Sequence, residues 1–169
     1  YCLTGGVDDF NPDDVKKKVI GGLGVDDILT GDGTDITLGD NGIITYAGAT
    51  GALELSSIVS TETSVGGDDV IDTDTGNKTV VAGYGADDVD AGTGDHIVIG
   101  DNGQITYTAD GEPLVLQSTD TTDHPEYGGA DFITLTGNGN NIVIGGMGGD
   151  DIDSGVGASG TDVILGDNG

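Results

Sequence analysis

Residues 21–29 read GGLGVDDIL, and the same plan returns as AGYGADDVD at 82–90 and as GGMGGDDID at 145–153. Each copy runs from a glycine-containing start to an aspartate doublet and then to an apolar residue. Glycines allow the positive φ values that a tight turn needs, and the apolar residue two positions after the first aspartate points inward. The stretch therefore predicts a turn of about six residues followed by a strand of about three.

These nonapeptides belong to a longer repeat. Residues 21–42 align without a gap on residues 82–103, at an offset of 61, and both segments end in GDNG. A third copy at 145–169 fits with three extra residues, ASG, at 158–160. The chain is therefore predicted to hold three units that form one continuous stack. Their bounds are 1–61, 62–123 and 124–169, the third being cut short after its GDNG.

Composition excludes several classes of protein. The 169 residues include 34 Gly, 31 Asp and Glu and only 4 Lys, for a formal net charge of −27. Such a chain lacks the positive footprint that nucleic acid requires, and an anionic membrane surface would repel it. No apolar run approaches the roughly 18 residues of a membrane-spanning helix, so direct membrane insertion is not expected. Short β-branched runs such as IVI and DVIL favour strands once the charge is neutralised.

The nonapeptide pattern GGxGxDxUx, in which U is a large apolar residue, resembles the RTX calcium-binding repeat family of large secreted bacterial adhesins and surface proteins. GGLGVDDIL matches this pattern at every defined position. The resemblance implies an all-β fold, a right-handed parallel β-roll (a β-solenoid), here with inserted β-hairpins. It also implies that backbone carbonyls and the sixth-position aspartate surround a Ca²⁺ shared with the next turn on the same edge. Calcium suits such a site because it accepts six to eight oxygen ligands in tolerant geometry.

Five nonapeptides, a to e, are assigned in each unit, the last being cut short in the third. In the first unit their sixth positions are Asp8, Lys17, Asp26, Asp35 and Ile44. In a β-roll successive turns alternate between two edges, so a, c and e share one edge while b and d share the other. Edge a/c has aspartate at both sixth positions in every unit, and calcium sites are predicted there. The pairs are Asp8 with Asp26, Asp69 with Asp87, and Asp131 with Asp150.

Edge b/d is mixed, so degenerate or absent calcium sites are expected on it. Lys17 either takes the place of the cation beside Asp35 or is a solvated surface charge. The sixth-position pairs are Lys17 with Asp35, Lys78 with His96, and Asn141 with Asp162.

The GDNG segments carry a further aspartate into each e turn, where the sixth position is apolar. These aspartates are Asp40, Asp101 and Asp167. They either bind metal in place of the missing side chain, which is the interpretation we favour, or form Asx-type turns. The candidate metal ligands are therefore Asp8, Asp26, Asp35, Asp40, Asp69, Asp87, Asp101, Asp131, Asp150, Asp162 and Asp167.

The strands of nonapeptides b and d are mainly apolar at outward as well as inward positions, as in Ile36 with Leu38 and Ile97 with Ile99. A sheet that is apolar on both faces requires a cover. The segments after the first two GDNG motifs, 42–60 and 103–120, are predicted to be β-hairpins. They either fold back over their own unit or pack on a neighbouring chain.

Function follows from the repeat. The chain, which begins at Tyr1, is expected to be a segment of a longer protein. We expect a calcium-stabilised structural region of a large extracellular or cell-surface bacterial protein: an adhesin, surface-layer or filament component. The resemblance implies type I secretion, and the tandem units make neighbouring copies of the chain possible partners. The alternative is the calcium-binding secretion block of an RTX toxin or exoenzyme whose activity lies elsewhere.

No enzymatic activity is expected from this segment. Aspartates repeated at the same place in every unit are better explained as structural ligands than as one active site. His96 and His124 are the only histidines, and their sequence contexts differ. Neither fits a Ser/His/Asp or Cys/His arrangement.

Overall fold

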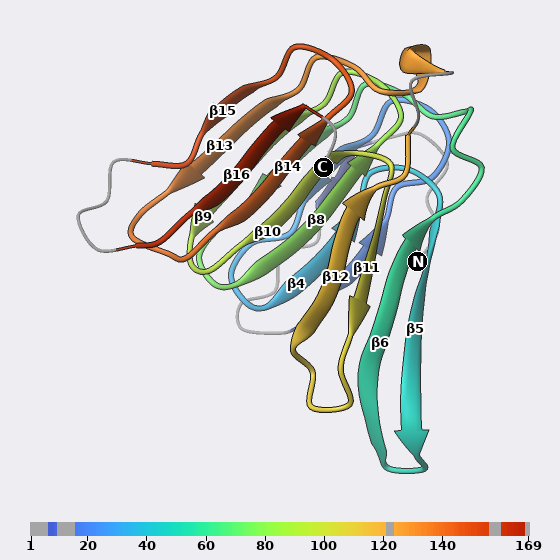
Figure 1. Cartoon of the computed structure of the whole chain (residues 1–169), viewed down its shortest axis with the longest axis vertical. Coiled ribbons are helices and arrows are strands. Elements are labelled where there is room, and N and C mark those ends of the chain that lie inside the picture. The colour runs from blue at the N-terminus through green and yellow to red at the C-terminus, as the bar shows by residue number, and fades with distance from the viewer. Residues whose placement is uncertain (1–6, 10–15, 121–123, 156–159, 168–169) are drawn as a thin grey trace.

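The computed structural model describes residues 7–9, 16–120, 124–155 and 160–167, with side chains from residue 16 onward. The described residues form strands in three sheets and one short 3-10 helix, Pro125–Tyr127. They contain no α-helix, so the predicted all-β class is confirmed (Figure 1). None of them belongs to a helix with the length and hydropathy that a bilayer crossing requires.

Sheet 1 contains six parallel strands. In spatial order they are β1 (Val7–Asp9), β3 (Asp27–Leu29), β7 (Val70–Thr73), β9 (Asp88–Thr93), β13 (Phe132–Thr136) and β15 (Asp151–Asp153). Their register places the inward apolar residues of successive strands level with one another, beginning with Ile28 beside Ile71 and Ile71 beside Val89.

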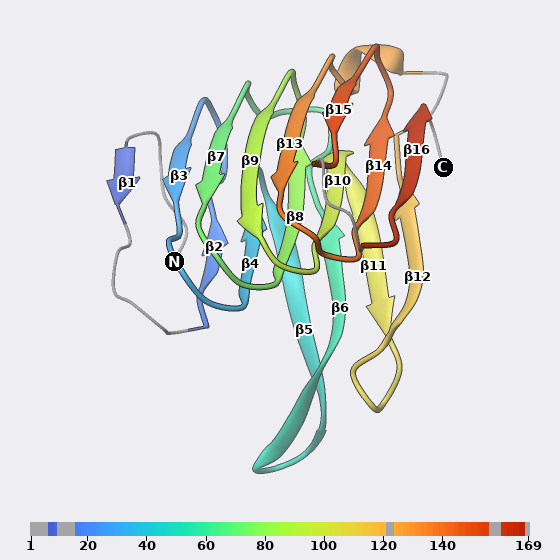
Figure 2. The same cartoon turned by 90° about the vertical axis from the view of Figure 1, so that its left-hand side faces the viewer.

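Sheet 2 also contains six parallel strands. In the same direction they are β2 (Lys18–Ile20), β4 (Asp35–Leu38), β8 (Lys78–Gly83), β10 (Ile97–Asp101), β14 (Ile142–Gly146) and β16 (Val163–Asp167). Outside the hairpins, consecutive strands along the chain alternate between sheet 1 and sheet 2. Figure 2 shows the two rows of strands side by side, with β1 and β16 at opposite ends.

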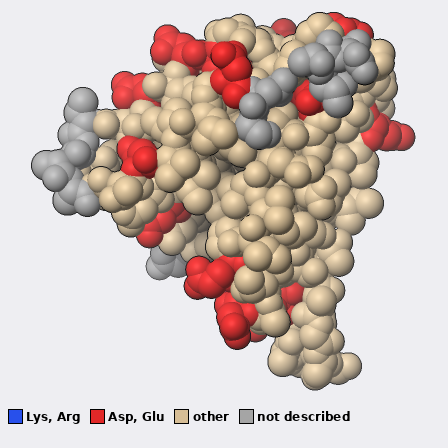
Figure 3. Space-filling view, in the orientation of Figure 1, with Lys and Arg blue, Asp and Glu red and all other residues tan. Residues whose placement is uncertain are grey.

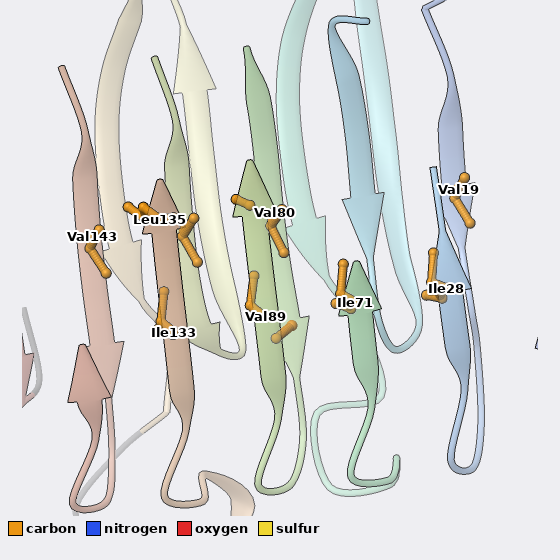
Figure 4. Packing of buried hydrophobic residues seen from close by; sticks show 11 residues of the cluster. Val19, Ile28, Ile71, Val80, Val89, Ile133, Leu135 and Val143 are labelled. Atoms are coloured by element: carbon orange, nitrogen blue, oxygen red, sulfur yellow. The ribbon is translucent and has the colours of Figure 1, made fainter. Parts of the chain in front are cut away.

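The main hydrophobic core lies between these two sheets. Its side chains come from most strands of the two sheets and are aliphatic (Figure 4). Each fully buried Val or Ile contributes about 1.5–3 kcal/mol relative to an exposed one. The labelled residues are Val19, Ile28, Ile71, Val80, Val89, Ile133, Leu135 and Val143.

Sheet 3 is antiparallel and covers the outer face of sheet 2 (Figures 1 and 2). Its strands, in order, are β12 (Pro113–Ser118), β11 (Gly103–Tyr107), β6 (Ala52–Ser60) and β5 (Gly42–Ala49). Ile58 and Ile105 of sheet 3 are fully buried against Leu38, Val81 and Ile99 of sheet 2. The apolar outer face and the two hairpins are therefore as predicted, and the hairpins cover their own chain.

The first strand departs from the expected register. The sequence spacing put Asp8 level with Asp26, but β1 pairs Asp8 with Ile28. Asp8 is level with Ile28 in sheet 1, and Val19 is level with Thr37 in sheet 2. Eleven positions separate Asp8 from Val19 along the chain, whereas nine separate Ile28 from Thr37. The connection from β1 to β2 is thus two residues longer than a nonapeptide allows. The side chain of Asp8 lies outside the described residues.

Candidate metal-binding edge

Five of the predicted aspartates stand in one row in the turns that lead into sheet 1, which we call edge 1 (top of Figure 1). Each precedes a sheet 1 strand, and the strand register brings them level at the interstrand spacing of about 4.8 Å. The first four are at most 2% exposed, and the last is partly exposed. They are Asp26, Asp69, Asp87, Asp131 and Asp150.

Each of these aspartates, with its turn, forms one rung of edge 1. One carboxylate oxygen of an aspartate accepts a hydrogen bond from the neighbouring rung. The backbone N–H of Asp26 donates to Oδ1 of Asp69 at 2.8 Å, and that of Asp69 donates to Oδ1 of Asp87 at 2.7 Å. Asp87 donates in the same way to Asp131 at 2.9 Å, and Asp131 to Asp150 at 3.1 Å. Every turn of the row is therefore fixed to the next by a carboxylate.

The other oxygen has no such partner. Among the described residues, Oδ2 of Asp69, Asp87, Asp131 and Asp150 is buried without a hydrogen bond. Burial, with repulsion from neighbouring carboxylates, raises the pKa of Asp69 to about 8, of Asp87 to about 10 and of Asp131 to about 7. A buried carboxylate is costly unless it is paired. Each rung therefore requires either a proton or a cation.

Glycines pack directly against several of these unpaired oxygens. A Cβ built on Gly39 would lie 2.4 Å from Oδ2 of Asp69 and 2.3 Å from the carbonyl oxygen of Ala82. A Cβ built on Gly145 would collide with Oδ2 of Asp150 and with the carbonyl oxygen of Gly166. Carboxylate and carbonyl oxygens thus come together beside glycines, where any larger side chain would displace them. This is the donor set that calcium prefers.

Side chains alone do not complete a metal site in this arrangement. In the part of the chain that the structure describes, no three His, Cys, Asp or Glu side chains form a group that could hold a metal ion. Each turn contributes one aspartate of the row, so a cation at edge 1 would take its other protein ligands from backbone oxygens or from the GDNG aspartates, whose carboxylates lie against the same turns.

The GDNG aspartates also reach neighbouring turns. Oδ2 of Asp40 accepts a hydrogen bond of 2.6 Å from the backbone N–H of Tyr84. Asp101 accepts one of 3.1 Å from Gly129 and another from Met147. All three hydrogen bonds come from residues far along the chain, so none of them forms the local Asx turn that was the alternative. Burial raises the pKa of Asp40 to about 7 and of Asp101 to about 8, and metal binding by both stays a prediction.

The remaining GDNG aspartate, Asp167, is exposed in β16. Its role as a metal ligand also stays a prediction.

Edge 2, formed by the turns that lead into sheet 2, contains a buried ion pair. Nζ of Lys78 lies 2.8 Å from Oδ2 of Asp35 and donates to the carbonyl oxygen of Gly31 at 2.6 Å. Oδ1 of Asp35 accepts the backbone N–H of Lys17 at 2.8 Å. Nζ of Lys17 is 4.0 Å from Asp35 and donates instead to the carbonyl of Asp32. Lys17 thus lies beside Asp35 and is not a solvated surface charge, but the closer cation is Lys78, which the sequence analysis did not pair with Asp35.

The described residues of the rest of edge 2 form no row of buried carboxylates. Oδ1 of Asn141 accepts a hydrogen bond of 3.1 Å from the backbone N–H of His96. Oδ1 of Asp162 accepts hydrogen bonds from the backbone N–H and from the side-chain amide of Asn141. His96 is buried, which lowers its pKa, and its Nε2 lies 3.0 Å from the carbonyl oxygen of Gly92. A neutral imidazole and an amide occupy positions that aspartate holds on edge 1.

Asparagines of the GDNG segments have a role that the sequence analysis missed. Asn102 is 1% exposed; its side chain donates to Oδ1 of Asp120 and to the carbonyl of Thr63, both at 3.2 Å. Asn41 donates in the same way to Glu62 at 3.2 Å. The contacts of Asn41 with Glu62 and of Asn102 with Asp120 join the start of each hairpin to the segment that follows it, and the contact with Thr63 joins the start of the second hairpin to the segment after the first. The repetition of DNG before both hairpins was the available signal.

Comparisons of the chain with protein-family models, with curated proteins and with solved structures find no match.

Proposed function

We propose that this chain is a calcium-stabilised structural repeat region of a large extracellular bacterial protein, such as an adhesin, surface-layer or filament component, and that it has no catalytic role. The observation that carries the proposal is the row of buried, unpaired Oδ2 atoms along edge 1. Asp69, Asp87, Asp131 and Asp150 supply one each. Calcium ions between successive rungs would satisfy them together with the backbone carbonyls.

The proposed fold is a right-handed parallel β-roll of RTX nonapeptides. Its support is the alternation of in-register strands between two parallel sheets. The turns fit the nonapeptide pattern as well, because Gly22 and Gly24 have φ values of 111° and 105°, which favour glycine over any other residue. Gly83 and Gly85 repeat this at 123° and 119°.

The charge of the chain makes folding dependent on cations. Acidic side chains spread over the face seen in Figure 3, and the formal net charge is −27. Repulsion within a compact acidic chain opposes folding, and an ion that binds only the folded state stabilises it by mass action. Calcium outside a cell would drive folding after type I secretion, since extracellular modules operate with weak sites.

A calcium titration with matched variants tests the proposal. Metal-free protein titrated with Ca²⁺ at constant ionic strength should pass cooperatively from coil to β-structure in far-UV circular dichroism. Asp87 is 2% exposed, whereas its neighbour Asp88 is exposed. Asp87→Asn should therefore raise the calcium midpoint by about tenfold, the effect of losing roughly 1.4 kcal/mol, while Asp88→Asn should leave it nearly unchanged.

The proposal fails if the β-signal is complete in chelator and calcium does not change it. It also fails if the two asparagine variants behave alike, because the buried row would then have no special role.

A further inference from the structure

Each hairpin of sheet 3 interrupts a turn of edge 1. The chain leaves β4 through Asp40, forms β5 and β6, and returns to edge 1 at Asp69, directly before β7. It leaves β10 through Asp101, forms β11 and β12, and returns at Asp131, directly before β13. We call these two interrupted turns the split turns. Each split turn thus has one buried aspartate before its hairpin and another after it.

The two aspartates of the first split turn lie against the same part of the next turn. A Cβ built on Gly39 would collide with Oδ2 of Asp69 and with the carbonyl oxygen of Ala82. A Cβ built on Gly83, the next residue after Ala82, would lie 2.6 Å from Oδ2 of Asp40. Oδ2 of Asp69 is buried and accepts no hydrogen bond from the described residues. Burial and repulsion from Asp40 raise the pKa of Asp69 to about 8, so the two carboxyl groups interact.

The second split turn repeats this arrangement. A Cβ built on Gly100 would collide with Oδ2 of Asp131 and would lie 2.6 Å from the carbonyl oxygen of Gly145. Oδ2 of Asp101 lies against the next residue, Gly146. Oδ2 of Asp131 is also buried without a hydrogen bond from the described residues. The second hairpin has shorter strands than the first, so the shared geometry belongs to the split turns and not to the hairpins.

The uninterrupted turns of edge 1 lack the second carboxylate. A Cβ built on Gly21 would collide with the carbonyl oxygen of Gly39 and would lie 2.7 Å from Oδ2 of Asp26, so one carboxylate and one carbonyl meet there. The second residue of the split turns is Asp40 or Asp101, and in the uninterrupted turns it is a glycine: Gly22, Gly83 or Gly146. Calcium affinity increases with the number of charged ligands.

We propose that each split turn binds one calcium ion between its two aspartates, Asp40 with Asp69 and Asp101 with Asp131, more tightly than the uninterrupted turns do, and that this ion holds the two ends of the hairpin together. A metal that closes a long loop removes conformational freedom from the open chain. Docking of each hairpin on sheet 2 is therefore coupled to its own calcium ion. This inference rests on the proposed calcium-dependent function.

Hydrogen exchange of the two hairpins during a calcium titration, read by mass spectrometry, tests the coupling. Asp40→Asn should raise at least tenfold the calcium concentration that half-protects the amides of β5 and β6, and should affect β11 and β12 much less. Asp101→Asn should do the reverse, so each variant controls for the other. Asp68→Asn removes an exposed carboxylate beside Asp69 and should leave both hairpins at the wild-type midpoint.

Equilibrium dialysis should find two calcium ions held more tightly than the rest in wild type and one in either variant. The inference is overturned if both variants expose both hairpins alike. It is also overturned if saturating calcium does not restore protection, because the aspartate would then act through its hydrogen bonds alone. Wild type that folds with calcium but binds all its ions equally would overturn the inference and leave the proposed function standing. β-structure that ignores calcium would overturn both.

Discussion

At the scale of single residues, each aspartate of edge 1 has two separate roles. Oδ1 of Asp87 accepts a backbone hydrogen bond from Asp69, while Oδ2 is buried and accepts no hydrogen bond from the described residues. The first role fixes the turn and needs no metal. The second role explains why aspartate recurs at this position, because a carboxylate offers one oxygen to the N–H group and a second, charged oxygen to a cation.

Lys78 shows how one rung can dispense with a metal. Its ammonium group lies between a carboxylate and a backbone carbonyl, which are the same kinds of ligand that edge 1 offers to a cation. The ion pair is almost fully buried, with side chains 1% and 0% exposed. Removing one partner of such a pair leaves an uncompensated charge.

Lys78→Met should therefore lower the free energy of unfolding by about 3–5 kcal/mol, because Asp35 stays buried without its cation. Lys17→Met is the matched control and should cost less than about 1 kcal/mol, since its ammonium lies 4.0 Å from the same carboxylate. Urea unfolding in saturating calcium measures both. Equal losses in the two variants would contradict the assignment of Lys78 as the principal partner.

At the scale of elements, sheet 3 buries the outer apolar face of sheet 2. The outward apolar residues of sheet 2 could be identified from the sequence as a surface that needs a cover, and the two hairpins could be identified as segments available to cover it. Whether the hairpins pack on their own sheet 2 or on another chain could not be predicted, because alternation of apolar residues defines a face but does not identify the surface that packs on it. The structure places Ile58 and Ile105 over that face.

Ile105→Ala should cost about 2–5 kcal/mol of stability, because Ile105 is 0% exposed and its truncation leaves a cavity between sheets 2 and 3. Leu114→Ala in the same sheet should change stability by no more than about 0.5 kcal/mol, since Leu114 is 65% exposed. Thermal and urea unfolding with calcium present measure the difference. A small loss for Ile105→Ala would mean that sheet 3 docks only loosely on sheet 2.

At the scale of the whole molecule, the buried carboxylates tie stability to pH and calcium together. Folding without metal raises the pKa of several aspartates above the ordinary 3.8, to about 7 for Asp131, about 8 for Asp69 and about 10 for Asp87. Between about pH 4 and these raised values, the folded state therefore binds more protons than the unfolded state. Protonation of these aspartates stabilises the folded state fully below about pH 4, and this stabilisation is lost as the pH rises through 7 to 10.

Metal-free protein should accordingly be more folded near pH 5 than near pH 8, by up to about 1.4 kcal/mol per pH unit for each such carboxyl. Calcium should abolish or reverse this trend, because metal binding requires the deprotonated form and releases protons. Circular dichroism of metal-stripped and calcium-saturated samples across this range measures the effect. Metal-free stability that rises with pH would contradict protonation of the buried row.

The sequence by itself determined the repeat, the all-β class, the two kinds of edge and the need to cover sheet 2. These follow from spacing and residue type, which a periodic chain displays directly. Only the tertiary structure decided that Lys78 is the cation at Asp35, that Asp8 stands level with Ile28, and that the hairpins cover their own chain. Each of these depends on which atoms meet across strands far apart in the sequence, and a repeat pattern carries no such distances.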